Sequence, residues 1–405
     1  MNASANFKTK TSFLKRNNLS LNGVWPIALD IGYSSVKAFS PNSVTRFPSY
    51  AKKIPENFAF AGTPPWNAII YKNNITNEFW LVGEVAQGIM SDNDTSDSEA
   101  SLYGRERYSA PLFKTLEDVG LGLSLLNDSM LTAISKNPES AEKNCVSYQN
   151  ERIIVQTGLP EKYMDDDCDL IESLEGNHSF SLKIGSNQWI SFDIDIAHDD
   201  IFVMSQPKGT LFSICTKNTG EYVFDAKNYL SSSIVVFDAG FGTLDLFPII
   251  KGTVKDGETY SDLGMKRVLQ ETAAEIKNRY KANIQVPTMQ KHLETGTVTL
   301  FDKKTFSSKE QGFEDILLEK SRLICEEAIQ RLSNVIDLSE YKYIIITGGT
   351  GAAWYNQILK KFENLTTLKI LKGSENDDLP FVFANVRGYY LYRVIKLKKE
   401  LDNAN

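Results

Sequence analysis

The sequence IALDIGYSS at residues 27–35 decides the fold, because its pattern returns as VVFDAGFGT at residues 235–243. Each copy is an apolar run followed by Asp, one further residue, Gly, an aromatic residue and small or hydroxyl residues. The apolar run predicts a buried strand, and the small residues predict a tight turn into a second strand. Backbone N–H groups of such a turn can converge on an anion, and an Asp at the strand end can hold a metal through water. The two copies, with Asp30 and Asp238, therefore predict two related half-molecules that grip one phosphate chain.

The composition is that of an ordinary globular protein and excludes several function classes. The 405 residues are too many for one simple core, so we expect two domains. A net charge of −7 argues against a nucleic-acid surface over the whole molecule. No apolar run approaches the roughly 20 residues that span a bilayer, and the basic N-terminal residues lack a signal-peptide core, so we expect a cytoplasmic protein. The four Cys and three His are scattered, which predicts reduced thiols and no structural zinc site.

A third glycine-rich stretch, YIIITGGTGA, occupies residues 343–352. A strand that ends in a glycine pair before a helix lets the backbone approach a ligand closely, here the sugar, α-phosphate and base of a nucleotide. The stretch has neither the GxGxxG spacing of dinucleotide-binding folds nor the GxxxxGK(S/T) pattern of P-loops. Glycine at a strand–helix junction is also common packing, so the interpretation depends on the order of all three stretches.

In this order the three stretches resemble the nucleotide loops of the actin-like ATPase superfamily. Residues 30–37 match the first phosphate loop, including a Lys seven positions after the Asp, and residues 238–245 match the second. Residues 348–351 match the adenosine loop, and residues 203–209 are similar to the segment that places a Gln or Glu beside the attacking water. The resemblance spans roughly residues 25–395. It implies an α/β, actin-like (ribonuclease H-like) fold, in which two similar domains, each with a subdomain insertion, surround a nucleotide cleft.

The residue pattern and the resemblance together predict how the chain is divided. A flexible basic extension precedes domain I, domain II follows with its own insertion, and a C-terminal helix returns to domain I. The expected bounds are 1–23 for the extension, 24–229 for domain I with an insertion at about 41–105, 230–379 for domain II with an insertion at about 263–325, and 380–405 for the helix. Residues 91–99 have no apolar member and predict an exposed acidic loop.

The resemblance implies a site for ATP, with GTP left open, and for Mg²⁺. The nucleotide-binding positions that it implies are Asp30, Gly32, Tyr33, Ser34, Lys37, Gly240, Phe241, Gly242, Thr243, Gly348, Gly349, Thr350 and Gly351. Lys37 would neutralise phosphate charge, although a solvated strand-end lysine is the alternative. Tyr33 and Phe241 place rings where many relatives have small or acidic residues, so at these two positions only the backbone amide would face phosphate.

The same resemblance assigns the catalytic and metal positions. Asp30 and Asp238 would hold hydrated Mg²⁺, which is commonly bound through only one or two carboxylates. Gln206 would orient the hydrolytic water, with Asp238 as the second catalytic residue, because phosphoryl transfer depends mainly on positioning and electrostatics. An ordinary turn residue before a proline is the alternative for Gln206. Asp245 is either a support for this site or a strand-end carboxylate.

The length, Gln206 and the sequence ANVRGY at residues 384–389 look most like the ParM-type plasmid-segregation actins of bacteria and archaea. This resemblance implies an ATPase that forms a head-to-tail filament and segregates plasmid DNA through a DNA-bound adaptor of the ParR type, without direct contact to nucleic acid or membrane. A sugar or metabolite kinase of the same superfamily is one alternative, although it needs a carboxylate base where Gln206 lies. A non-polymerising nucleotide-binding regulator is the other. Filament handedness, strand number and nucleotide preference stay open.

Overall fold

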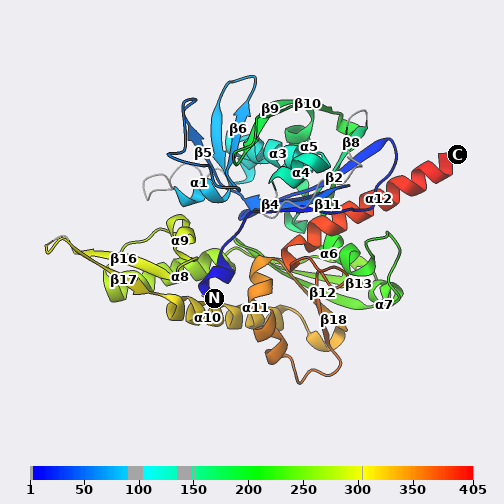
Figure 1. Cartoon of the computed structure of the whole chain (residues 1–405). Coiled ribbons are helices and arrows are strands. Elements are labelled where there is room, and N and C mark those ends of the chain that lie inside the picture. The colour runs from blue at the N-terminus through cyan, green and yellow to red at the C-terminus, as the bar shows by residue number, and fades with distance from the viewer. Residues whose placement is uncertain (1–2, 90–103, 135–147, 149–150, 303, 405) are drawn as a thin grey trace.

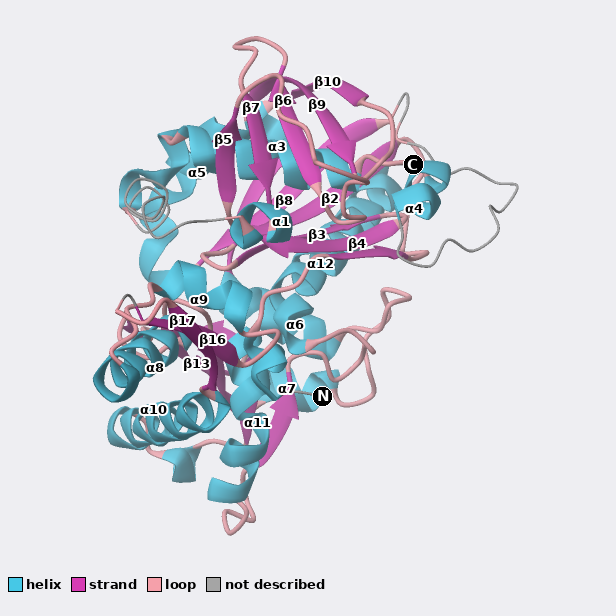
Figure 2. Ribbon diagram, turned by 60° about the vertical axis from the view of Figure 1, so that its left-hand side comes forward, coloured by secondary structure: helices cyan, strands magenta, loops and turns pink. Residues whose placement is uncertain are grey.

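The computed structural model describes residues 3–89, 104–134, 148, 151–302 and 304–404, and these residues form two lobes (Figure 1). The expected acidic loop at 91–99 lies outside the described residues. Figure 2 shows that each lobe is a layered arrangement of strands and helices, as an α/β fold requires.

The first lobe is built on a six-stranded sheet with the order β1-β4-β3-β2-β8-β11. β2, β8 and β11 run parallel, whereas β3, β4 and β1 continue the sheet as antiparallel neighbours. The strands are β1 (Ser12–Lys15), β2 (Val24–Ile31), β3 (Ser35–Ser40), β4 (Ser43–Pro48), β8 (Arg152–Leu159) and β11 (Ile201–Ser205). β2 is buried along nearly its whole length, as expected of a strand that is covered on both faces.

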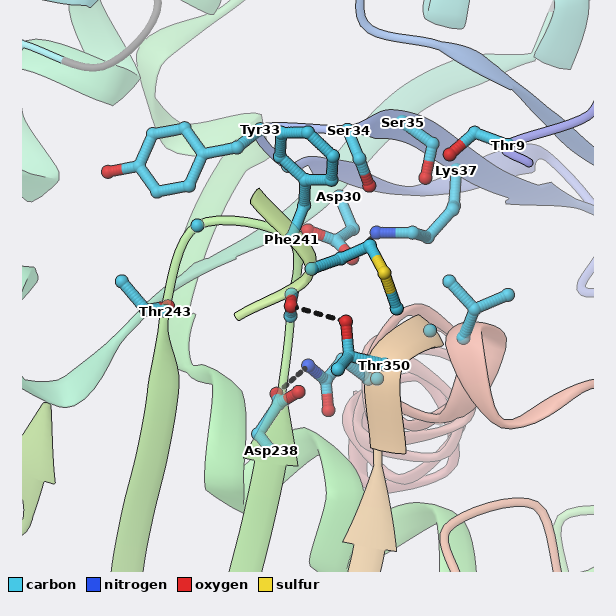
Figure 3. A pocket seen from close by; sticks show the side chains of 18 of the residues that line it. Thr9, Asp30, Tyr33, Ser34, Ser35, Lys37, Asp238, Phe241, Thr243 and Thr350 are labelled. Atoms are coloured by element: carbon cyan, nitrogen blue, oxygen red, sulfur yellow. Dashed lines mark hydrogen bonds and ion pairs between the residues drawn. The ribbon is translucent and has the colours of Figure 1, made fainter. Parts of the chain in front are cut away.

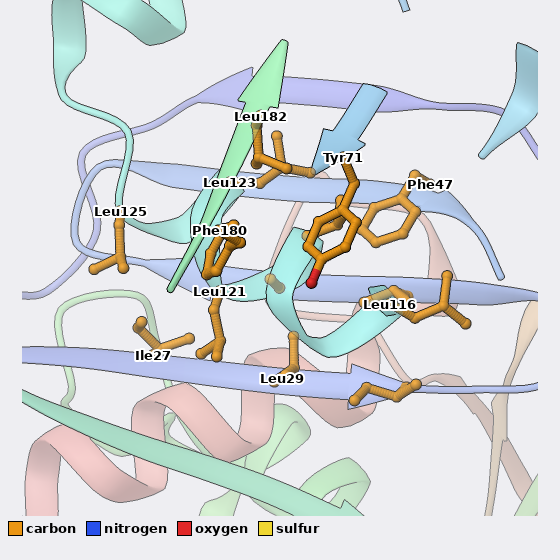
Figure 4. Close-up of a cluster of buried hydrophobic side chains, with 14 of the residues drawn as sticks. Ile27, Leu29, Phe47, Tyr71, Leu116, Leu121, Leu123, Leu125, Phe180 and Leu182 are labelled. Atoms are coloured by element: carbon orange, nitrogen blue, oxygen red, sulfur yellow. The ribbon is translucent and has the colours of Figure 1, made fainter. Parts of the chain in front are cut away.

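Two helices cover the two faces of this sheet. α3 (Pro111–Ser124) packs against β2 and β3, and α12 (Ala384–Ala404) packs against β2, β3 and β8. Successive side chains of β2 point to opposite faces of the sheet. Leu29 therefore lies in the core under α3, and Ala28 lies in the core under α12. Figure 4 shows Leu29 beneath Leu116 in the first of these cores.

A second, antiparallel sheet caps the first lobe in the order β10-β9-β6-β7-β5. Its strands are β5 (Ala51–Ile54), β6 (Ile69–Asn73), β7 (Phe79–Val82), β9 (Gly176–Ile184) and β10 (Ile190–Ile196). The insertion expected at about 41–105 therefore supplies only three of these strands, and it starts after β4, which belongs to the main sheet. The short helices and turns of this lobe are α1 (Glu84–Gly88), η2 (Arg105–Ser109), α4 (Asp128–Ile134), η3 (Glu161–Asp166), α5 (Asp167–Leu174) and η4 (His198–Asp200).

The second lobe repeats the design around the sheet β14-β13-β12-β18-β19, with β15 paired to β13. The strands are β12 (Ser233–Ala239), β13 (Leu244–Ile250), β14 (Thr253–Val254), β15 (Glu258–Tyr260), β18 (Tyr343–Thr347) and β19 (Lys369–Lys372). The helices are α6 (Gln206–Cys215), α7 (Ala226–Ser231), α8 (Met265–Tyr280), α9 (Val286–His292), α10 (Glu314–Val335) and α11 (Gly349–Lys361), with turns η5 (Leu338–Glu340) and η6 (Phe381–Phe383). Residues 297–312 add the hairpin β16 (Thr297–Asp302) and β17 (Ser307–Gly312).

The two lobes share one topology at their centres. In the first lobe a hairpin of β2 and β3 has β8 as its parallel neighbour, and in the second a hairpin of β12 and β13 has β18. Asp30 and Asp238 occupy equivalent places near the end of the first hairpin strand. The predicted fold of two similar α/β halves is thereby confirmed.

The first residues of the chain differ from the expected flexible extension. Turn η1 (Ala3–Phe7) lies against the second lobe, where Ser4 is fully buried. β1 then joins the first lobe as an edge strand, because its backbone pairs with β4 over four residues. The sequence prediction was wrong here because backbone hydrogen bonds hold even a polar, basic segment in a sheet.

Candidate functional site

A cavity of about 550 Å³ lies between the lobes at the place where the three glycine-rich turns meet. This volume is in the range of small-molecule sites. Figure 3 shows Asp30, Ser34 and Lys37 of the first lobe facing Asp238 and Thr350 of the second. The predicted residues that line the cavity are Asp30, Gly32, Tyr33, Ser34, Lys37, Gln206, Asp238, Gly240, Phe241, Gly242, Thr243, Gly348, Gly349 and Thr350.

The first turn joins β2 to β3 and carries an ion pair at its base. Asp30 and Lys37 are cross-strand partners, and Lys37 Nζ lies 2.8 Å from Asp30 Oδ2 with both side chains buried. The Gly32 N–H donates to the Ser35 carbonyl at 3.1 Å, which closes the turn. Lys37 is therefore a buried cation beneath the turn and not a solvated strand-end lysine.

The second turn, between β12 and β13, has the same hydrogen bond. The Gly240 N–H donates to the Thr243 carbonyl at 2.8 Å. The acceptor lies three residues after the glycine, as in the first lobe. Asp245 lies opposite Asp238 in the hairpin, and its carboxylate accepts from the hydroxyls of Thr243 at 2.8 Å and Thr259 at 2.7 Å. Asp245 thus braces the second turn from below.

The third turn, at Gly348, packs the start of α11 against the second turn. Gly348 has a φ of +81°, and a Cβ there would lie 2.2 Å from the Ala239 carbonyl oxygen, so only glycine fits without displacing the strand end. The Thr350 hydroxyl donates to the Gly240 carbonyl at 2.7 Å and links the turns directly. Gly351 does not line the cavity, because it faces Ile346, whose Cγ2 would lie 3.1 Å from an added Cβ.

The carboxylates of the second lobe are held in an environment that disfavours their charge. Burial raises the pKa of Asp238 to about 7, with Asp245 and Asp30 adding to the rise and Asn385 and Lys37 opposing it. Burial also raises the pKa of Asp245 to about 6, against the hydrogen bonds from Thr259 and Thr243. A buried carboxylate that lines a cavity and is perturbed in this way is typical of a functional site.

Gln206 is the first residue of α6, directly after β11, and it lines the same cavity. α6 is locked to α12, because a Cβ on Gly388 would lie 1.8 Å from the Gly209 carbonyl oxygen. The two helices can therefore cross in backbone contact only through glycine at this position. The crossing brings α6 beside the start of α12, where the Thr210 hydroxyl donates to Asn385 Oδ1. Gln206 and Asn385 both line the cavity.

The structure adds residues that sequence reasoning missed. Asn385 Nδ2 donates to Asp238 Oδ2 at 2.9 Å and orients that carboxylate. The Arg107 guanidinium lies over the Tyr33 ring, 5.2 Å from its centroid, and both residues line the cavity. The Tyr33 ring reaches the second lobe, since a Cβ on Gly242 would lie 3.0 Å from Tyr33 Cδ2. Asn385 lies within the ANVRGY stretch, whereas nothing in the sequence around Arg107 indicated a role at the site.

Two observations bear on what the cavity can hold. The Ser35 hydroxyl lines the cavity and is buried without a hydrogen-bond partner among the described residues, so a polar ligand or water is needed there. Within the described part of the chain, no three His, Cys, Asp or Glu side chains gather into a metal-binding group. The donor set of two separate carboxylates with turn amides suits a metal that retains water and phosphate ligands. No helix in the described ranges combines the length and apolar character of a membrane span.

The chain has an actin-like fold, with a cavity between its two lobes. Residues 28–209 match the family model for the N-terminal domain of actin-like proteins. No curated protein matches the sequence.

Solved structures show that the fold is of the ParM type. A ParM filament structure from Clostridium botulinum is 19% identical, with a TM-score of 0.63 over 91% of this chain and 99% of that one. The apo ParM protein of pSK41 is 18% identical, with a TM-score of 0.59 over 94% and 100%. An archaeal actin homologue in complex with ADP is 15% identical, with a TM-score of 0.59 over 90% and 97%.

Proposed function

We propose that this protein is a nucleotide-driven, filament-forming ATPase of the ParM type. The observation that carries the proposal is the pair of equivalent turns that face one cavity from opposite lobes. Each turn is closed by a hydrogen bond from its glycine N–H to the carbonyl three residues later. One anionic chain between them would receive backbone donors from both sides. ATP is the expected ligand, and the archaeal homologue with ADP supports a nucleotide in this fold.

The residues present fit Mg²⁺ together with a nucleotide. Asp238 and Asp30 would hold the hydrated metal, which supplies charge neutralisation at the phosphates when bound. Asn385 orients the Asp238 carboxylate, and Lys37 holds Asp30 in place while its positive charge lies beneath the first turn. The raised pKa of Asp238 fits a group whose charge a cation would complement.

Gln206 is the residue that would orient the attacking water for hydrolysis. It projects from a helix that is locked to α12, so its position depends on rigid elements rather than on a mobile loop. An amide can orient water but is a poor proton acceptor, which favours hydrolysis over transfer to a sugar hydroxyl. The kinase alternative would need a carboxylate at this place.

Closure of the lobes around nucleotide would fix the outer surfaces for head-to-tail addition. Each turn contributes contacts that only the closed form makes together, so the nucleotide favours that form. Repeated heterologous contacts that do not close into a ring produce a filament. The Clostridium botulinum ParM structure of the same fold is a filament, which supports this step. In the cytoplasm, a DNA-bound adaptor of the ParR type would connect such filaments to plasmid DNA.

Sedimentation of the purified protein with Mg²⁺ and ATP, ADP or no nucleotide tests the proposal. We expect pelletable polymer with ATP, a higher critical concentration with ADP and little polymer without nucleotide, and electron microscopy should show filaments in the ATP sample. Moderate salt should help assembly, since subunits of net charge −7 repel one another. ATP turnover by a protein that stays monomeric at every concentration would contradict the filament. Sugar-dependent ADP release would then identify the kinase alternative.

A further inference from the structure

The N-terminal segment crosses from one lobe to the other along the wall of the nucleotide cavity. Its residues from Ala5 to Lys10 line the cavity together with Ser34, Ser35 and Lys37. Figure 3 shows Thr9 beside Ser35 and above Lys37. The sequence predicts a flexible extension here, whereas in the structure these residues form part of the cavity wall.

The two ends of the segment are anchored on different lobes. At the second lobe, the Ser4 hydroxyl donates to the Leu293 carbonyl at 2.6 Å, and Phe7 packs against the hydrophobic core beneath α8 and α10. At the first lobe, the Arg46 side chain donates to the Lys10 carbonyl at 3.0 Å, and β1 follows at once in the main sheet. The segment between these anchors therefore spans the cleft.

Lys8 makes the ionic contact at the centre of this span. Its Nζ lies 3.1 Å from Glu84 at the start of α1 and 2.6 Å from Glu294, which follows α9. Glu84 also accepts from the Thr11 N–H at 2.8 Å. The Lys8 side chain is only 13% exposed, so its charge is screened less than that of a surface lysine.

The contact lies where the insertions of the two lobes meet. α1 and α9 touch each other across the cleft, and both Figure 1 and Figure 2 show them facing one another. Separation of the lobes at this edge must break the bond of Lys8 to Glu84 or to Glu294. Opening of the cavity is therefore coupled to release of the segment.

We propose that residues 3–11 form a strap across the cleft, locked by Lys8 between Glu84 and Glu294, that slows nucleotide exchange. This inference rests on the proposed nucleotide function of the cavity. The strap adds a barrier to opening without taking part in hydrolysis, so it sets how long a nucleotide stays bound.

The release rate of ribose-labelled fluorescent ADP, chased with excess ADP, tests the strap in the full-length protein. Lys8→Met keeps the aliphatic stem but removes the charge, and Glu294→Gln removes one partner on a half-exposed side chain. We expect each to release ADP about fivefold faster, the factor that a contact of about 1 kcal/mol gives. Lys53→Met is the matched control, because Lys53 pairs with Glu78 on the exposed face of the same insertion, and it should stay within about twofold of wild type.

Two further readouts separate the possible failures. Added salt should accelerate release from the wild type more than from Lys8→Met, since the variant keeps only the longer ion pair between Lys10 and Glu294, at 3.6 Å. Release at the wild-type rate from both Lys8→Met and Glu294→Gln, with unchanged thermal unfolding, overturns the strap and leaves the nucleotide site standing. If the wild-type protein binds no labelled ADP, the proposed function fails and the strap fails with it.

Discussion

Replacement of Asp238 by Asn should stabilise the nucleotide-free protein while it abolishes hydrolysis. Asp238 is buried, and its pKa is raised from an ordinary 3.8 to about 7, first by burial and then by the nearby carboxylates of Asp245 and Asp30. An Asn side chain has nearly the same shape and can still accept the hydrogen bond from Asn385. The substitution therefore removes the cost of ionising this position in the folded state.

The size of the effect follows from the pKa difference. The folded protein binds the proton more tightly than the unfolded chain, so stability falls as the pH rises from about 4 to about 7 and is constant above. A difference of about three pKa units corresponds to about 4 kcal/mol at pH 7 and above. The gain of Asp238→Asn over wild type should therefore reach a few kcal/mol at pH 8 and vanish near pH 4.

Urea unfolding in EDTA, without nucleotide, at pH 5, 6, 7 and 8 measures this difference. Asp195→Asn is the control, because Asp195 lies exposed on β10 and should change stability by less than about 0.5 kcal/mol at every pH. A variant at position 238 that is no more stable than wild type at pH 8, or whose gain does not depend on pH, would refute the electrostatic reasoning. Normal ATP turnover in that variant would instead remove Asp238 from the proposed site.

Three other substitutions test separate parts of the structure. Gln206→Ala should slow hydrolysis by about 10²-fold with nearly unchanged nucleotide binding; single-turnover kinetics at the normal rate would return Gln206 to the role of a turn residue. Gly348→Ala should destabilise the protein in urea by at least about 2 kcal/mol more than Gly176→Ala, because both have positive φ but only the first would place a Cβ 2.2 Å from a carbonyl oxygen. Glu117→Gln should stabilise the protein by about 3 kcal/mol at pH 7 and little at pH 4, since burial raises the pKa of this carboxyl group in α3 to about 8; equal urea midpoints at pH 7 would contradict it.

The central architecture was predictable from sequence because it depends on local patterns. The apolar runs before Asp30 and Asp238 are continuous, as strands covered on both faces require, and the small residues after them specify the turns. The repeat of this pattern indicated two equivalent halves. The resemblance to the actin-like loops predicted the site residues, and fourteen of them line one cavity in the structure. Their roles in nucleotide binding and hydrolysis stay predictions that mutation can test.

The missed features depend on contacts between distant segments, which no local pattern encodes. β9 and β10 join the sheet of the first insertion although they come about a hundred residues later in the chain. The crossing of α6 and α12 requires Gly209 and Gly388 to meet, and neither glycine stands in a recognisable turn pattern. The N-terminal segment is polar, yet the partners of Lys8 lie on two different insertions. Composition alone could not pair these groups.

The charge that folding disfavours at Asp238 is the charge that the proposed site needs. A ligand that binds only the folded protein and complements this carboxylate stabilises the fold in proportion to the logarithm of its concentration. Bound nucleotide with its cation would thus offset much of the cost that Asp238 imposes on the empty cleft. The proposed strap affects the rate of opening instead, because the ion pairs of Lys8 add to the barrier for opening whichever nucleotide is bound. Nucleotide would therefore set how stable the closed form is, and the strap how quickly that form can be left.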